Sequence, residues 1–320
     1  MRIRYLDNVR AICMVWIVGI WHLSDYCEVA ISNPITSNIT YGVLGAFTFL
    51  SGAMLGGREI KSQEDTLLFY KRRFLRIYPL FAISCTSLLL LNILFDVQFI
   101  TDLQQYFLTM LGISIVFTPA PGTIWYISML LLFYAITPFL LYKTSDNRSN
   151  IVFKSTIVYG VFLVITLTQI SHVDERCLYL FPIYCAGLVI GKEPLLNKKF
   201  KPSLLISGGV FFIVLCLIKY KVGEISFGVD IIYTVGVIAV FILFILEFGK
   251  LFVGNVGRLL EKISYASMCA YLFHRQIYGV FSKLFGPFSF VEAVVFFFCV
   301  LIICYGIQLL YDWFLKKIGQ

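Results

Sequence analysis

Long apolar runs alternate with short polar segments along the whole chain. A helix needs about 20 mostly apolar residues to cross a membrane. Ten runs approach or reach this length, and we predict a membrane-spanning helix in each of them. The predicted spans are residues 9–25, 40–57, 74–95, 123–142, 151–170, 177–191, 203–219, 228–247, 264–284 and 289–314.

One further apolar segment, residues 104–118, is too short for a span and is closed by Pro119 and Pro121. It favours a re-entrant or interfacial helix. The first apolar run has no A-x-A-like cleavage site after it, so we interpret it as a transmembrane helix and not as a cleaved signal. The pattern predicts an all-α, polytopic integral membrane protein with about ten transmembrane helices. Residues 1–320 are expected to form a single domain, with no separate soluble domain.

Positive charge is distributed unevenly between the loops. Lys and Arg are concentrated in the two terminal segments and in every second loop, and loops of this kind face the cytoplasm. Both termini are therefore predicted to be cytoplasmic. Hydrophobic residues make up 59% of the 320 residues and charged residues only 14%, which is too little charge to cover a soluble globule. The net charge of +8 thus indicates the cytoplasmic bias of a membrane protein, and we expect no nucleic-acid partner.

Polar groups inside a membrane are costly, so each one is a candidate for function. Asp7 and Arg10 lead into the first predicted span, and His22 lies about 18 Å further along it at 1.5 Å per residue. A histidine at this depth can act as a base. The alternative is an interfacial histidine beside Trp21 in an aromatic belt.

A basic cluster stands where the third predicted span begins. Arg72, Arg73 and Arg76 occur together there, and Arg73 and Arg76 share a helix face because they are three residues apart. Guanidinium groups bind phosphates through paired hydrogen bonds. The cluster therefore indicates a site for an anionic ligand, while ordinary positive-inside anchoring remains the alternative.

Other polar residues fall in later spans. Ser51 and Gly52 lie late in the second span. Ser51 could offer a hydroxyl to a reaction, but small residues at a site of close helix packing explain this segment equally well. Trp125 begins another span at its predicted outer end. His274 lies about 15 Å into its span, a depth comparable to that of His22. The adjacent Arg275 must face protein or water and not lipid.

In chain order these segments resemble the acyltransferase family 3 membrane proteins, and the resemblance covers nearly the whole chain. The first-span histidine, His22, is one of the matched features. The others are Leu6-Asp7-x-x-Arg10, Phe47-x-x-x-Ser51-Gly52, Arg72-Arg73-x-x-Arg76-x-x-Pro79, the span from Trp125 through Tyr134 to Pro138, and Ser267-x-x-x-Tyr271-x-x-His274.

The resemblance implies transfer of an acyl group, usually acetyl, from cytoplasmic acyl-CoA to a hydroxyl of a cell-surface polysaccharide or lipid-linked glycan. Acyl-CoA would be a substrate, and no permanently bound cofactor is expected. His22 would be the base or the acyl acceptor, with Arg10 its partner. The CoA phosphates would be held by Arg72, Arg73 and Arg76. The pocket would be shaped by Asp7, Ser51, Trp125, His274 and Arg275, with Trp125 a candidate platform for a sugar ring.

The family also implies a setting. The protein would be a multi-pass protein of the bacterial inner membrane, in contact with membrane lipids and with proteins of glycan assembly. No cysteine or histidine spacing typical of zinc occurs, and no metal site is expected. The predicted outer loop that holds His172 is expected to leave this histidine in solvent. The alternative function is a proton-coupled glycan or lipid transporter, against which the lack of an internal repeat counts.

The spacing of Arg10 and His22 departs from the family. The family usually has ten residues between these positions, whereas this chain has eleven. At about 100° per residue, a step of 11 returns to nearly the same helix face and a step of 12 misses it by about 120°. We therefore predict a π-bulge or a bend near Gly19 that absorbs the extra residue.

Overall fold

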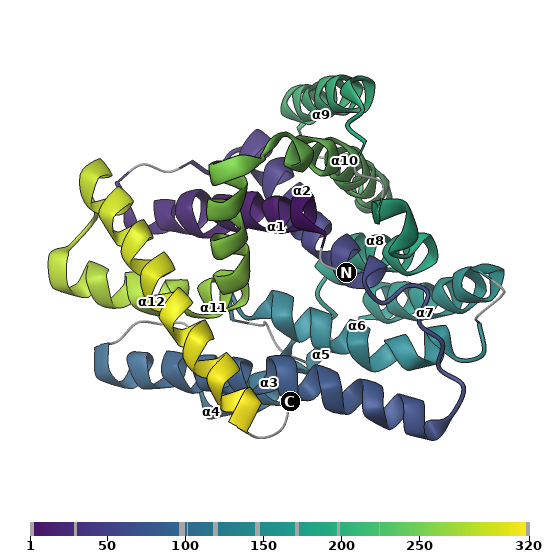
Figure 1. Ribbon diagram of the computed structural model, residues 1–320, viewed down its shortest axis with the longest axis horizontal. Helices are drawn as coiled ribbons and strands as arrows, with labels where there is room; N and C mark the ends of the chain where they lie inside the picture. Colours follow the sequence, from purple (N-terminus) through teal and green to yellow (C-terminus); the bar gives the residue numbers. More distant parts are fainter. Residues whose placement is uncertain are drawn as a thin grey trace. The chain divides into compact units, whose positions relative to one another are not determined.

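The computed structural model describes residues 3–28, 31–95, 100, 102–117, 121–144, 148–169, 173–196, 199–223 and 225–317. Twelve α-helices lie in this part of the chain, and no β-strand is found there (Figure 1). The helices are α1 (Arg4–Trp16), α2 (Pro34–Ala53), α3 (Gln63–Phe95), α4 (Leu103–Met110), α5 (Ser114–Phe117), α6 (Trp125–Leu141), α7 (Arg148–Thr168), α8 (Arg176–Ile190), α9 (Pro202–Val222), α10 (Phe227–Phe248), α11 (Gly254–Phe285) and α12 (Phe290–Lys317).

Each of the ten predicted spans overlaps a helix, and the described part of the short segment 104–118 contains α4 and α5, separated at Gly112. Within the described residues, six segments are long and apolar enough to cross a membrane, namely Arg4–Tyr26, Gln63–Phe95, Arg148–Thr168, Pro202–Val222, Phe227–Leu251 and Phe290–Lys317. The chain is thus a multi-pass membrane protein with an all-helical fold. The count of ten spans and the side of the termini stay predictions.

Two helices begin well before the apolar run that predicted them. α3 starts at Gln63, and α11 starts at Gly254. The polar start of α3 is stabilised by a reciprocal cap, in which Asp65 N donates to Ser62 Oγ over 3.1 Å and Ser62 N donates to the Asp65 carboxylate over 3.1 Å. An apolar run predicts only the part of a helix that contacts lipid, whereas the helix itself begins at its capping residues.

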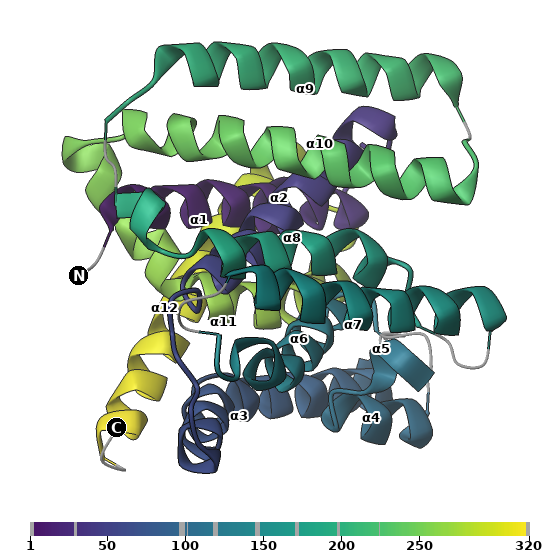
Figure 2. The same cartoon turned by 90° about the vertical axis from the view of Figure 1, so that its right-hand side faces the viewer.

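The chain divides into two compact units. The first contains Met1–Val43, Lys198–Glu224 and Val240–Gln320, and the second contains Leu44–Asn197 and Ile225–Ala239. In the first unit α1 packs against α11, which packs against α12 (Figures 1 and 2). The C-terminal part of α10 lies along α9, where a Cβ at Gly208 would approach Phe244 Cβ to 3.2 Å (Figure 2).

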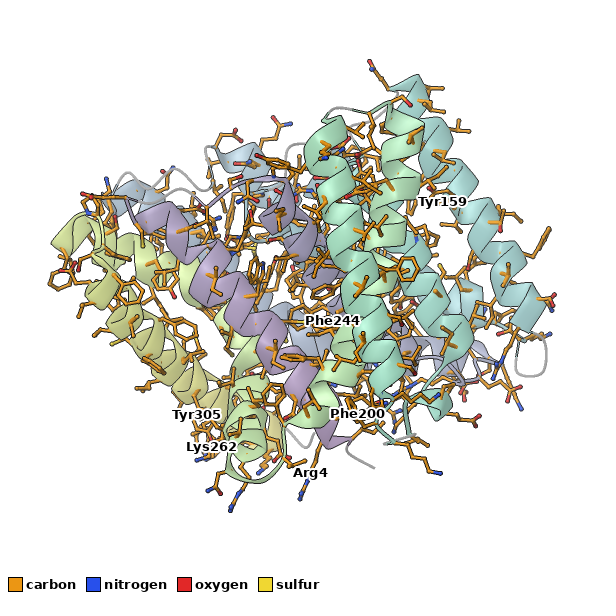
Figure 3. The ribbon with its side chains drawn as sticks, turned by 90° about the horizontal axis from the view of Figure 1, so that it is seen from above. Arg4, Tyr159, Phe200, Phe244, Lys262 and Tyr305 are labelled. Atoms are coloured by element: carbon orange, nitrogen blue, oxygen red, sulfur yellow. The ribbon has the colours of Figure 1, made fainter. Side chains whose placement is uncertain are left out.

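Close backbone contacts and buried polar bonds hold α1 in the first unit. A Cβ at Gly249 would lie 2.5 Å from a Val9 methyl group, so only glycine fits there. Asn8 Nδ2 donates to the carbonyl oxygens of Gly249 and Phe252, both over 2.9 Å, and so satisfies carbonyls that follow the end of α10. Arg4 and Lys262 project at the same end of this unit (Figure 3).

The second unit is built around a close crossing of α2 and α8. A Cβ at Gly52 would lie 2.2 Å from the Tyr184 carbonyl oxygen, and a Cβ at Gly187 would lie 2.3 Å from the Phe49 carbonyl oxygen. Backbone therefore meets backbone at this crossing, the use of small residues that membrane helices favour. Buried hydroxyl pairs add to it, with Thr137 Oγ1 2.5 Å from the Tyr184 hydroxyl.

Candidate active site

His22 is positioned by a π-helical turn, which confirms the prediction made from its spacing. After α1 ends at Trp16, residues Ile17–Trp21 form one π turn around Gly19. The backbone N–H of His22 donates to the Ile17 carbonyl over 2.9 Å, a bond that spans five residues in place of the usual four. The turn absorbs the extra residue, and His22 faces the protein with only 7% of its surface exposed.

The partner of His22 is His274, which α11 contributes. Nδ1 of His22 lies 2.7 Å from Nε2 of His274, and both side chains are buried. The rings are inclined by only 10° with centroids 4.8 Å apart. Because stacked rings cannot bring nitrogens within 2.7 Å of each other, the two rings meet edge to edge and share an in-plane hydrogen bond. Two histidines that are 252 residues apart in sequence thus form one hydrogen-bonded pair.

His274 is held in turn by the backbone of its own helix. Its Nδ1 lies 2.8 Å from the Ala270 carbonyl oxygen and 2.9 Å from the Tyr271 carbonyl oxygen. The Tyr278 hydroxyl, one turn further along α11, donates to the Val18 carbonyl over 3.3 Å, inside the π turn. This bond ties α11 to the π turn that carries His22.

An ion pair lies just past the two histidines. Arg275 Nη2 lies 2.7 Å from Asp25 Oδ2, and the Tyr26 hydroxyl donates to the Arg275 carbonyl over 3.2 Å. Phe288 N donates to the Tyr26 carbonyl over 2.8 Å, which ties the end of this segment to the turn between α11 and α12. Asp25 and Tyr26 were not among the predicted site residues. The available signal was an acidic residue three positions after one histidine and an arginine directly after the other.

Arg10 and Asp7 form a separate group at the opposite end of α1. Arg10 Nη1 lies 3.3 Å from Asp7 Oδ1, and the same oxygen accepts a bond from Ser264 Oγ at 3.2 Å. His22 lies twelve positions after Arg10, about 18 Å further along at 1.5 Å per residue. In the structure Arg10 contacts Asp7, whereas His22 contacts His274, and the role of Arg10 as the partner of His22 stays a prediction.

The three arginines of the basic cluster lie in the second unit, on α3. Arg72 and Arg76 are exposed, and Arg73 is half-buried. The Arg73 guanidinium lies 5.3 Å from the ring centroid of Tyr134 and 5.8 Å from that of Phe69. Such cation–π contacts orient a guanidinium without using up its hydrogen-bond donors, so the cluster keeps donors for an anion.

Ser51 and Trp125, also in the second unit, are already engaged by the protein. Ser51 Oγ donates to the Phe47 carbonyl of its own helix over 2.8 Å. The Trp125 ring is buried, and the Arg176 guanidinium covers it at 3.7 Å from the centroid. Arg176 is itself paired with Asp174, with Nε 2.7 Å from Oδ1. Gly52 serves the helix crossing, which favours the packing interpretation of that segment. His172 lies outside the described residues.

The comparisons with known proteins give one positive finding. The family model described as "Acyltransferase domain" matches residues 3–309. The search of curated proteins and the search of solved structures each find no match.

Proposed function

This chain is a member of acyltransferase family 3, and from that premise we propose that it is a membrane O-acyltransferase that uses cytoplasmic acyl-CoA, most simply acetyl-CoA. The acceptor is a hydroxyl of a cell-surface polysaccharide or of its lipid-linked precursor. The proposal places the enzyme in the bacterial inner membrane.

The observation that carries the proposal is the buried His22–His274 hydrogen bond of 2.7 Å. Acyl transfer to a hydroxyl requires a base, because a neutral alcohol is a weak nucleophile. An imidazole that is fixed by a second group is the usual solution for this task. A buried polar pair is also costly in a membrane protein, which favours a catalytic purpose over a purely structural one.

In the proposed reaction His22 accepts the proton of the acceptor hydroxyl while the hydroxyl oxygen attacks the thioester carbonyl. The new C–O bond forms and the C–S bond breaks. CoA leaves as a thiolate, which takes the proton from His22, so that the histidine returns to its starting state. The products are the O-acylated sugar and CoA thiol, and no other reactant is consumed.

The basic cluster on α3 supports the choice of CoA as the carrier. Arg72, Arg73 and Arg76 present guanidinium groups, whose paired donors match phosphate oxygens. In this proposal they bind the CoA phosphates. Asp7 and Arg10, at the other end of α1 from His22, take part in positioning α1 and not in proton transfer.

The test is the mass of surface glycans from cells that carry the wild type, His22→Ala, Ile20→Ala or no copy of the gene. Ile20 is the matched control because it lies in the same π turn and is 42% exposed. We expect acetyl-sized mass increments with the wild type and Ile20→Ala, and none with His22→Ala at equal protein level. If no glycan gains mass with the wild type while glycan export depends on the gene, a transporter takes the place of this function.

A further inference from the structure

The hydrogen bonds around His274 determine where its proton lies. Nδ1 of His274 is 2.8 and 2.9 Å from two backbone carbonyl oxygens, those of Ala270 and Tyr271. A carbonyl oxygen only accepts hydrogen bonds, so Nδ1 must carry the hydrogen. A neutral imidazole has one N–H, and Nε2 of His274 is therefore a bare acceptor nitrogen.

The same reasoning extends to His22. Nε2 of His274 accepts, so Nδ1 of His22, 2.7 Å away, must donate. The hydrogen of neutral His22 is then on Nδ1, and Nε2 of His22 is unprotonated. The opposite arrangement would place two lone pairs 2.7 Å apart, or would require a doubly protonated His274. The latter would be a cation in a side chain with 0% exposure, next to the guanidinium of Arg275.

We propose that His274 is the positioning residue that holds His22 in its Nδ1–H form and so makes Nε2 of His22 the basic atom of the site. This inference rests on the proposed transfer reaction for its purpose but not for its geometry. Free histidine in water prefers the Nε2–H form, in which Nε2 could not accept a proton. The Ala270 and Tyr271 carbonyls, acting through His274, reverse that preference.

The arrangement also determines the route of the proton. When His22 Nε2 takes the hydroxyl proton, the resulting imidazolium donates from both nitrogens. His274 stabilises it as an acceptor at Nε2 but cannot relay the proton, because its own Nδ1–H faces only carbonyl oxygens. The proton must stay on His22 until the CoA thiolate takes it. His22 thus serves as base and then as acid, which is the division of roles in a fixed-imidazole mechanism.

The direct test is the tautomer of each histidine by 15N-histidine NMR of the protein in lipid bilayers. The chain has only three histidines, and His22→Gln and His274→Gln assign the signals. We expect both His22 and His274 to carry the hydrogen on Nδ1 at a pH where they are neutral. Finding the hydrogen on Nε2 of His22 in the wild type would overturn the proposal.

A matched pair of variants links the tautomer to the rate. In His274→Gln the side-chain oxygen can take the place of Nε2 as acceptor, whereas His274→Leu has similar bulk and no acceptor. Transfer is measured in membranes, with acetyl-CoA as donor and glycan from cells lacking the gene as acceptor. We expect kcat to fall about 10²- to 10⁴-fold in His274→Leu, within the range for loss of an oriented base, with KM for acetyl-CoA unchanged. His274→Gln should keep most of the rate and the Nδ1–H form of His22.

The outcomes separate the two proposals. If kcat falls equally in His274→Leu and His274→Gln while the tautomer of His22 is unchanged, His274 has only a packing role and the inference is overturned. A wild type that transfers no acyl group but shows Nδ1–H on His22 would overturn the proposed function and support the tautomer assignment. If His274→Leu does not fold, the tautomer of His22 in the wild type and the kcat of His274→Gln still test whether His274 positions His22.

Discussion

Arg275 and Asp25 form an ion pair with Nη2 and Oδ2 2.7 Å apart. Each follows a histidine of the site closely in sequence: Asp25 comes three residues after His22, and Arg275 comes one residue after His274. The pair joins the segment after α1 to α11, so it fixes the two histidine-bearing segments against each other. The Arg275 side chain is 18% exposed and the Asp25 side chain 49% exposed, so one end of the pair is reached by solvent.

We predict that this pair contributes to activity more than to stability. Because Asp25 is half-exposed, the coupling free energy between the two should be about 0.5–1 kcal/mol, within the range for solvent-reached pairs. A double-mutant cycle with Asp25→Asn and Arg275→Gln, followed by thermal unfolding in lipid, measures it. The rate of acyl transfer should fall severalfold in each single variant, because the segments that carry His22 and His274 are then held less firmly against each other. Strictly additive effects on both readouts would show that the pair is incidental.

The π turn predicts how the protein responds to deletion or insertion of one residue before His22. Deleting Ile20 converts the bond from His22 N to the Ile17 carbonyl from a five-residue into a four-residue bond between the same groups. A regular helix then presents His22 on the same face, so we expect the deletion to retain transfer. Inserting one alanine after Ile20 rotates the ring by about 100° further and should abolish transfer as completely as His22→Ala does.

Glycan acylation in cells, at matched protein levels, compares these two length variants. An active insertion variant together with an inactive deletion variant would mean that the π turn itself, and not the face on which His22 lies, is needed.

The sequence predicted the helices because twenty-residue apolar runs are unambiguous, and it predicted the π turn because a one-residue excess can be absorbed in few ways. It could not predict the partner of His22. That partner depends on the packing of α1 against α11, and nothing local to residue 22 specifies a residue 252 positions away. The role of Arg10 as the partner of His22 came from the resemblance to the family, and in the structure Arg10 contacts Asp7 at 3.3 Å.

The crossing of α2 and α8 predicts which glycines are sensitive to substitution. Gly52→Ala would place a Cβ 2.2 Å from the Tyr184 carbonyl oxygen, and the backbone cannot move aside as a flexible side chain can. We expect a loss of about 1–3 kcal/mol of stability, the usual cost of overpacking. Gly160→Ala in α7 is the control, since nothing lies within 4 Å of its Cβ position and alanine favours helix. Thermal unfolding of the purified protein compares them, and similar midpoints for both variants would contradict the tight crossing.

The basic cluster predicts a change in donor affinity. Arg73→Ala or Arg76→Ala should raise the KM for acetyl-CoA about 10- to 100-fold, since a hydrogen bond to a charged group contributes about 1.5–3 kcal/mol. Lys71→Ala removes an exposed charge from the same segment and should change KM little. The effect should shrink when dephospho-CoA thioester is the donor, because a phosphate is already missing. An equal rise in KM for all three variants would indicate general positive charge and not a phosphate site.

Trp125 distinguishes a sugar platform from a structural contact. The Arg176 guanidinium covers the buried ring at 3.7 Å and is held by Asp174, so the ring is occupied by a cation. We expect Trp125→Phe to lower the stability by about 0.5–2 kcal/mol, the range for cation–π contacts, and to leave the KM for the glycan acceptor unchanged. Arg176→Lys, which keeps the charge and loses the planar stack, should lower stability in the same direction. A large rise in acceptor KM for Trp125→Phe, with stability unchanged, would instead establish the ring as part of the acceptor site.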